Sequence, residues 1–316
     1  MATSGSTDLG TTGTELAYTA MQILGQYGSD ITTLATEDST LALKMLNWYM
    51  KHLQAKQGFL WKTAVAYLFL DGSNLTYTLS TSGSHATESY STTTTSALAA
   101  ANATTLTVTS TTGMTTNDTI VIPKSDDTYQ STTITVASST SLTLGTGLTE
   151  ALASGSRIYT YTTKLSKPIR IHTFATRHYD SSGTFNDYER KITTFNDYQS
   201  MTPDKVYQGE PLSIAYLPLR TTGKVYVRGL NEDLTRIGVI TIQKEIEDID
   251  SGSNEPDYPS EWFLPLAFKL AYYLSFILEF DSQARQELGA EADRLIADTL
   301  SNDYESAALE ITNRMR

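Results

Sequence analysis

The sequence predicts an α+β protein in which helices at both chain ends form a helical bundle, around a central antiparallel β-domain that carries an inserted small β-sandwich or barrel domain. Apolar residues recur at helical spacing near the N-terminus and again near the C-terminus. Between these regions, apolar and polar side chains alternate as they do in strands. One stretch of this middle region is rich in Ser and Thr and almost free of Lys and Arg, which marks it as an insertion.

Composition limits the classes of function. The chain has 316 residues, enough for two or three domains, and its 18% charged content lies below the usual level of about 25%. A net charge of −12 and a pI of about 4.8 disfavour a protein that binds nucleic acid by neutralising phosphates. An acidic surface would instead let DNA slide past. The absence of cysteine excludes disulfides and thiolate metal sites.

Neither a signal peptide nor a membrane span is predicted. Residues 1–13 are mostly Gly, Ser and Thr and lack a basic segment followed by an apolar run, so they are predicted to form a flexible arm. The longest apolar stretch, residues 262–280, is interrupted by Pro265, Lys269 and Glu279. These interruptions argue against insertion into a membrane.

Residues 14–58 are predicted to form the N-terminal helices of the bundle. Thr12 and Glu15 have the spacing of a capping box, and apolar residues follow at helical intervals as far as Gly28. A second helix is expected to begin at Thr36, where two acidic residues in the first turn favour the helix dipole.

Residues 59–79 and 164–250 are predicted to form the central antiparallel β-domain. The first of these ranges alternates like a hairpin, with its turn at residues 71–74. Clear strands are expected in the second range, at residues 169–171, 225–227 and 239–242.

The pentapeptide Thr-Phe-Asn-Asp-Tyr occurs twice in the second range, at residues 184–188 and 194–198. The simplest interpretation is two similar turn-to-strand transitions or chance, and the alternative is a duplicated interface loop.

Residues 80–163 are predicted to form the inserted Ser/Thr-rich β-domain. Its short apolar runs are separated by turn residues at the spacing of a small sandwich or barrel. The low-complexity start, residues 80–101, is expected to be a flexible entry.

Residues 259–316 are predicted to form the C-terminal helices of the bundle. Pro259 and Ser260 open a helix with a broad apolar face, and a second helix follows Asp281. Because the chain begins and ends in helices, the two ends are expected to pack together.

No catalytic motif is recognisable, and no enzyme activity, cofactor or metal is predicted. The sequence contains no nucleophile elbow, phosphate-binding loop or zinc helix motif. The best histidine pair, His172 and His178, would share one face of a strand but lie about 20 Å apart, too far for one metal ion. Interface or surface positions are the expected roles of these histidines.

An acidic run between the β-domain and the C-terminal helices is the place where an enzyme would be sought. Two carboxylates there could cleave a carbohydrate, whereas the simpler interpretation is a solvated strand end and linker. The run comprises Glu245, Glu247, Asp248, Asp250, Glu255 and Asp257.

Several segments carry a resemblance. Near the N-terminus a short helix ends near Gly, a second helix contains a Leu-Asn step, and Gly-x-x-Trp leads into the first strand. A proline-to-tryptophan entry precedes the C-terminal helix. The matching residues are 17–25, 42–47, 53–61, 167–171, 208–211, 215–216 and 256–262. In this order they resemble the head-to-tail adaptor family of short-tailed bacteriophages, also called packaged-DNA-stabilising tail accessory or tail tubular protein A-like proteins.

The resemblance implies a structural protein of the virion, located in the phage tail or neck and assembled in the host cytoplasm. It implies a dodecameric ring of this chain that binds the portal protein above and the tail nozzle protein, or a tail fibre protein, below. Such a ring retains packaged DNA and forms part of the ejection channel, through which DNA passes without specific binding. The inserted domain resembles, at residues 117–119 and 154–159, a β-insertion found in larger members.

Two further expectations concern binding. Because adaptors of this family contact the portal through C-terminal segments, Tyr304, Leu309, Ile311 and Arg314 are the residues expected at that interface. The alternative function is that of a β-rich virion attachment protein, associated with tail fibres, whose insertion binds host surface glycans. Its weakness is the helical frame at both chain ends, which attachment fibres usually lack.

Overall fold

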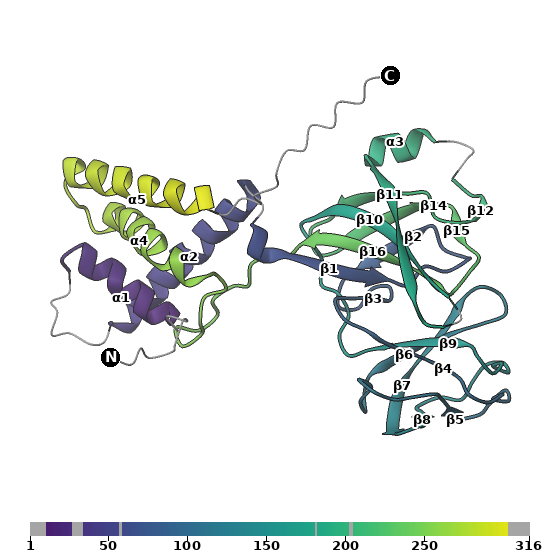
Figure 1. Cartoon of the computed structure of the whole chain (residues 1–316). Coiled ribbons are helices and arrows are strands. Elements are labelled where there is room, and N and C mark those ends of the chain that lie inside the picture. The colour runs from purple at the N-terminus through teal and green to yellow at the C-terminus, as the bar shows by residue number, and fades with distance from the viewer. Residues whose placement is uncertain (1–10, 27–33, 57–58, 181, 202–204, 303–316) are drawn as a thin grey trace, which may run out of the picture. The chain divides into compact units, whose positions relative to one another are not determined.

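The computed structural model describes residues 11–26, 34–56, 59–180, 182–201 and 205–302 (Figure 1). The fold is mixed α+β, mostly β-structure with a few helices and with curled, barrel-like sheets. The chain divides into two compact units, a helical unit made of Met1–Lys62 and Glu245–Arg316 and a β-unit made of Thr63–Lys244.

The helical unit draws its elements from both chain ends. In it α4 packs against α1, α2 and α5, and these helices share one apolar core that contains Leu16, Leu46, Trp262 and Leu270. Its elements are α1 (Gly13–Ile23), α2 (Thr36–Lys56), η1 (Leu60–Lys62), η2 (Ser260–Trp262), α4 (Phe263–Ile277) and α5 (Ser282–Asn302).

The start of α1 confirms the predicted capping box. The Thr12 N–H donates to Glu15 Oε2 at 2.7 Å, and the Glu15 N–H donates to Thr12 Oγ1 at 3.3 Å. Gly13, placed in the flexible arm by the sequence, is instead the first residue of α1, and its N–H donates to the Asn254 carbonyl at 2.9 Å. Residues 1–10 lie outside the described part of the chain.

The end of α1 comes earlier than predicted. Gly25, at φ 69°, stops the helix in place of Gly28. The Gln26 N–H donates to the Met21 carbonyl at 3.1 Å and the Gly25 N–H donates to the Gln22 carbonyl at 2.8 Å, which together form a Schellman motif. A glycine with positive φ leaves the helical conformation, and Gly28 lies outside the described residues.

The main sheet of the β-unit has eight strands in the order β2-β14-β13-β11-β10-β16-β1-β3. These strands are β1 (Thr63–Leu68), β2 (Thr76–Leu79), β3 (Ala86–Thr87), β10 (Arg170–Tyr179), β11 (Phe185–Thr193), β13 (Ser213–Pro218), β14 (Gly223–Arg228) and β16 (Arg236–Gln243). The predicted strands at 169–171, 225–227 and 239–242 fall on β10, β14 and β16. The sheet is not wholly antiparallel, because β11 and β13 pair in parallel.

Three small elements complete this part of the β-unit. They are α3 (Phe195–Ser200) and the parallel pair β12 (Gln208–Gly209) and β15 (Leu230–Asn231).

The hairpin predicted in residues 59–79 does not form. Both edges of β1 are occupied by other strands, β16 on one side and β3 on the other, while β2 pairs with β14. The turn itself exists, since the N–H groups of Ser73 and Asn74 donate to Asp71 Oδ1 at 2.9 and 2.8 Å. A local turn signal therefore did not determine which strands pair.

The inserted domain is a closed six-stranded barrel with its own apolar core. Its strands are β4 (Ser91–Thr94), β5 (Thr105–Thr107), β6 (Thr119–Pro123), β7 (Tyr129–Ser138), β8 (Ser141–Leu144) and β9 (Arg157–Tyr161), in the order β4-β9-β6-β7-β8-β5. The bridge between Thr95 and Val108 joins the two outer strands, and the Ser96 N–H donates to the Thr107 carbonyl at 2.9 Å. Closure removes the free strand edges that otherwise attract other chains.

The start of the insertion is ordered rather than a flexible entry. β3 joins the eight-stranded sheet and β4 joins the barrel. Farther on, Ala99 and Leu152 form a bridge whose two N–H···O bonds measure 2.9 and 2.8 Å. Low complexity misled the prediction because threonine, which is abundant in this segment, suits a pleated surface whose other face is buried.

Candidate functional site

Two of the segments that carry the family resemblance, residues 53–61 and 256–262, meet in the helical unit. Phe59 stacks on Trp61 with ring centroids 5.2 Å apart and meets Trp262 edge-on at 5.4 Å. Lys62, which follows the Gly-x-x-Trp segment, forms an ion pair with Asp257 of the proline-to-tryptophan segment. We call Asn47, Phe59, Trp61, Asp257 and Trp262 the motif cluster.

Asn47, from the Leu-Asn step of α2, fixes the chain as it returns from the β-unit. Its Nδ2 donates to the Ile249 carbonyl at 3.0 Å, and its Oδ1 accepts from the Ile249 N–H at 2.9 Å. One turn along α2, Lys51 Nζ donates to the Ile246 carbonyl at 2.7 Å. At the next turn, Gln54 Oε1 accepts from the Ile246 N–H at 2.8 Å. Because the three positions are spaced i, i+4 and i+7, one polar stripe of α2 binds the returning backbone.

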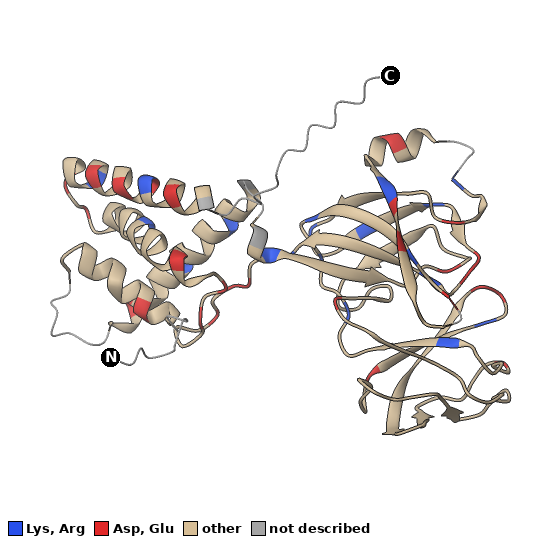
Figure 2. Ribbon diagram, viewed as in Figure 1, with Lys and Arg blue, Asp and Glu red and all other residues tan. Residues whose placement is uncertain are grey.

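The acidic run is part of this returning segment, and Figure 2 shows acidic residues concentrated along it. Asp248 lies 3.2 Å from Lys51, and Asp257 accepts from the Glu247 N–H at 2.9 Å as well as pairing with Lys62. These contacts give Asp248 and Asp257 structural partners in the helical unit. The arrangement agrees with the simpler interpretation, an exposed linker held by lysines.

The barrel and the eight-stranded sheet meet along a seam of aromatic side chains. Phe69 and Tyr159 lie 5.1 Å apart, and the Arg157 guanidinium stacks 4.4 Å from the Tyr179 ring and donates to the Asp180 carbonyl at 3.2 Å. The members of this tyrosine seam are Tyr67, Phe69, Tyr90, Val121, Tyr129, Tyr159, Tyr161, Tyr179 and Ile237.

Burial beside the seam keeps one histidine and one tyrosine neutral. Burial lowers the pKa of His85 to about 4, and the His85 Nδ1 lies 2.6 Å from the Tyr161 hydroxyl. Burial also raises the pKa of Tyr161 to about 12. Both side chains are therefore neutral near pH 7.

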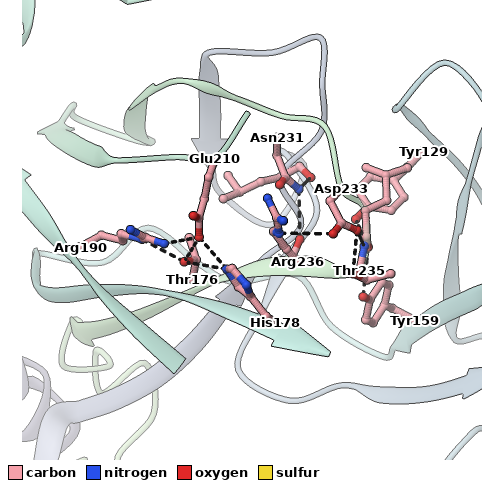
Figure 3. A network of polar contacts seen from close by, with 12 residues as sticks. Tyr129, Tyr159, Thr176, His178, Arg190, Glu210, Asn231, Asp233, Thr235 and Arg236 are labelled. Carbon is pink, nitrogen blue, oxygen red and sulfur yellow. Dashed lines mark hydrogen bonds and ion pairs between the residues drawn. The ribbon is translucent and has the colours of Figure 1, made fainter. Parts of the chain in front are cut away.

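Two tyrosines of the barrel hold one turn of the main sheet (Figure 3). The hydroxyls of Tyr129 and Tyr159 both donate to the Leu234 carbonyl, each at 3.1 Å. The turn is closed by Asp233, whose Oδ1 accepts from the Thr235 N–H at 3.0 Å. Asn231 Nδ2 donates to the Arg236 carbonyl at 3.1 Å. The barrel is thus attached to the sheet by buried, directional bonds and not by a flexible linker alone.

A second polar cluster in Figure 3 surrounds Glu210. Its Oε1 accepts from Thr176 Oγ1 at 2.9 Å, lies 2.6 Å from His178 Nε2 and pairs with Arg190. Burial by itself would raise the pKa of Glu210, but the Thr176 hydrogen bond and the Arg190 charge bring it below its ordinary value. An ionised carboxylate with these partners ties β10 and β11 to the segment before β13.

The predicted site residues are only partly placed. His178 belongs to the Glu210 cluster, whereas His172 lies at a bulge of β10 and is exposed. The bulge shifts the alternation, so the two histidines do not share the expected face. Among described residues, no group of three acidic or histidine side chains could hold a metal ion. Tyr304, Leu309, Ile311 and Arg314 lie outside the described residues.

An open groove of about 840 Å³ runs along α2, which we call the α2 groove. The Trp48 side chain lines it with 59% of its surface exposed, and Lys44 Nζ stacks 4.9 Å from the Trp48 ring. This site was not predicted from the sequence. The available signal was that Trp48 falls outside the apolar positions of α2, so its ring was expected on the exposed face of the helix.

Comparison with protein-family models finds no match, and a search of curated proteins finds none either. None of the helices in the described ranges is both long enough and apolar enough to cross a bilayer.

Proposed function

We propose that the chain is a structural head-to-tail adaptor of a short-tailed bacteriophage. It assembles into a dodecameric ring between the portal protein and the tail nozzle or fibre proteins, retains packaged DNA and contributes to the ejection channel. It catalyses no reaction. The helices of the two chain ends act as one bundle, which forms the body of the ring, and the β-unit presents the remaining contact surfaces.

The observation that carries the proposal is the motif cluster. Segments matching the family around residues 59–61 and 256–262 are far apart in the sequence, yet their aromatic side chains contact one another, and Asn47 binds the returning segment at Ile249. Two chance matches of short motifs would have no reason to pack together. Convergence of this kind is expected when the matched residues share one structural task.

The acidic composition supports the same function. A net charge of −12 opposes lasting adhesion of DNA, as a conduit requires. The rigid attachment of the barrel by the tyrosine seam also suits a structural part of a virion, since a platform for partner proteins must keep its orientation.

The test is to mix the purified chain with portal rings made from the same phage genome and to image the mixture by electron microscopy. The expected result is a ring of this chain stacked coaxially on the portal, with twelve subunits. A chain ending at residue 302 should lose portal binding and keep its circular dichroism spectrum. Portal rings that remain bare beside the intact chain would reject the adaptor function, and the chain would then be screened for glycan binding.

A further inference from the structure

The helical unit exposes two apolar surfaces. One is the α2 groove with Trp48. The other lies where α4 turns into α5. There Phe276 and Ile277 are 51% and 43% exposed, beside the exposed acidic residues Glu279 and Asp281. We call these four residues the α4–α5 knob.

The α4–α5 knob has a fixed conformation. Glu279 has φ 54°, which is unusual for a residue other than glycine. The Phe280 N–H donates to the Ser275 carbonyl at 3.1 Å, and Asp281 Oδ2 accepts from the Gln283 N–H at 2.9 Å. Both helix ends at the turn are thus closed by hydrogen bonds. A preformed surface loses little conformational entropy when it binds.

The two surfaces lie at opposite ends of α1. Thr14, near the start of α1, lines the α2 groove. Leu24, just after its end, lines a separate hollow together with Phe280, next to the knob. Leu24 follows Thr14 by ten positions, which along a helix is roughly 15 Å at 1.5 Å per residue. One copy can therefore use both surfaces at once.

The charges of the two surfaces are complementary. In the α2 groove, Lys44 stacks on Trp48, and Lys51 is bound to Asp248. Asp250 also lines the groove. On the knob, Glu279 and Asp281 offer partners to Lys44. Beside the knob, Arg285, stacked 5.1 Å from Phe276, offers a partner to Asp250.

We infer that the α4–α5 knob of one copy of this chain occupies the α2 groove of the next copy. This inference rests on the proposed ring and specifies its subunit contact. The contact is heterologous, because two different surfaces meet, and a heterologous contact is the kind that generates rings. Phe276 lies against Trp48, and Glu279 lies against Lys44.

Cysteine cross-linking tests the contact cleanly, because the chain has no cysteine of its own. Lys44→Cys marks the groove and Ile277→Cys marks the knob. With a bismaleimide reagent, a chain carrying both substitutions should give a ladder of multimers. Either single variant should stay monomeric, and an equimolar mixture of the two should stop at dimers. The control pairs Lys44→Cys with Thr135→Cys on the barrel, which should give no ladder.

Absence of a ladder would overturn the inferred contact, and dimers from a single-cysteine chain would replace it with a symmetric one. The reaction is run on the free chain and on portal-bound rings. If rings form on the portal but cross-linking gives no ladder, the inferred contact is rejected and the proposed adaptor function is still supported. A ladder from a chain that does not bind the portal supports the contact and rejects the adaptor function.

Charge reversal adds an independent check that needs no cross-linker. Lys44→Glu should weaken self-association by a factor of up to roughly five, the size of effect seen for surface ion pairs. Adding Glu279→Lys to the same chain should restore it in sedimentation velocity experiments. Failure of the second substitution to restore association would contradict the pairing of Lys44 with Glu279.

Discussion

Residues 184–188 and 194–198 have the same sequence, Thr-Phe-Asn-Asp-Tyr, and different structures. The first copy begins β11, whereas the second forms α3 with its N-cap. Tyr188 is 48% exposed at the sheet surface, while Tyr198 is only 4% exposed. The expectation of two similar turn-to-strand transitions was therefore wrong for the second copy.

The flanking residues decide between the two structures. Before the first copy, Asp180 accepts from the Thr184 N–H at 2.9 Å and closes the turn from β10. Asp187 then binds Arg177 of β10 through two hydrogen bonds of 2.8 and 2.7 Å. These contacts come from a neighbouring strand and hold the pentapeptide extended.

The second copy has no neighbouring β10 and satisfies its own backbone. Thr194 Oγ1 accepts from the Asp197 N–H at 3.1 Å, so the threonine serves as an N-cap and the aspartate lies in the first turn. Tyr198 then packs 5.4 Å from Tyr226 of β14. The comparison teaches that five residues do not determine a conformation when tertiary partners differ.

The largest difference between the copies is expected at the tyrosines. Tyr198→Ala should lower the free energy of unfolding by about 3–4 kcal/mol, because a buried aromatic ring is lost and a cavity remains. Tyr188→Ala should cost less than about 1 kcal/mol, as exposed positions usually do. Urea denaturation of the full chain measures both. Equal losses would show that the burial of Tyr198 is not what stabilises α3.

A smaller difference is expected at the threonines. Thr194→Ala removes the N-cap of α3 and should cost about 1 kcal/mol. The matched variant Thr184→Ala should stay within about 0.5 kcal/mol, because the side chain of Thr184 caps no helix. The same denaturation assay compares them, and Thr194→Ser serves as the control that keeps the cap. If Thr184→Ala lowers the free energy of unfolding as much as Thr194→Ala does, the loss of the N-cap is not what separates the two copies.

The smallest expected effect depends on pH. The Ser182 hydroxyl, followed by the N–H groups of Thr184 and Ser182, lowers the pKa of Asp180 in the folded protein. A lowered pKa stabilises the turn above the ordinary aspartate value of about 4, and this stabilisation is lost as the pH falls through the folded value. Acidification should therefore speed the hydrogen exchange of Thr184, after correction for the intrinsic rate. Hydrogen exchange of the Asp197 N–H serves as the internal reference, because this group donates to the Thr194 hydroxyl, which does not titrate.

Asp180→Asn should abolish this pH response. A Thr184 amide that keeps its protection at low pH in the unmodified chain would show that the carboxylate charge does not maintain the turn.

Local signals in the sequence predicted the local structure of this protein well. The capping box of α1, the start of α2 at Thr36 and the C-terminal helices depend on side chains a few residues apart, and each was recognised. Strand positions such as β14 and β16 followed from alternation. Strand pairing did not, since the partners of β1 are β16 and β3, which lie far along the chain or in the low-complexity segment, and not the neighbouring strand β2.

The candidate site was predictable only in pieces. The Leu-Asn step and the acidic run were both noticed, but Asn47 and Ile249 are separated by 202 positions, and no spacing rule connects them. Trp48 was overlooked because a helix pattern shows which face is buried and not whether the other face is free. The Glu210 cluster combines β10, β11 and a later segment, so its members share no sequence signature.

The closed barrel has a consequence for how this chain could gain or lose it. Ser91 of β4 pairs with Thr160 of β9, so the two ends of the inserted segment lie side by side. A genetic deletion between them would need only a short bridge and would break no strand of the main sheet. It would, however, strip the cover from Phe69 and Ile237. A chain without the barrel must therefore carry polar residues at those two positions, whereas one that acquires a barrel must supply aromatic partners for them.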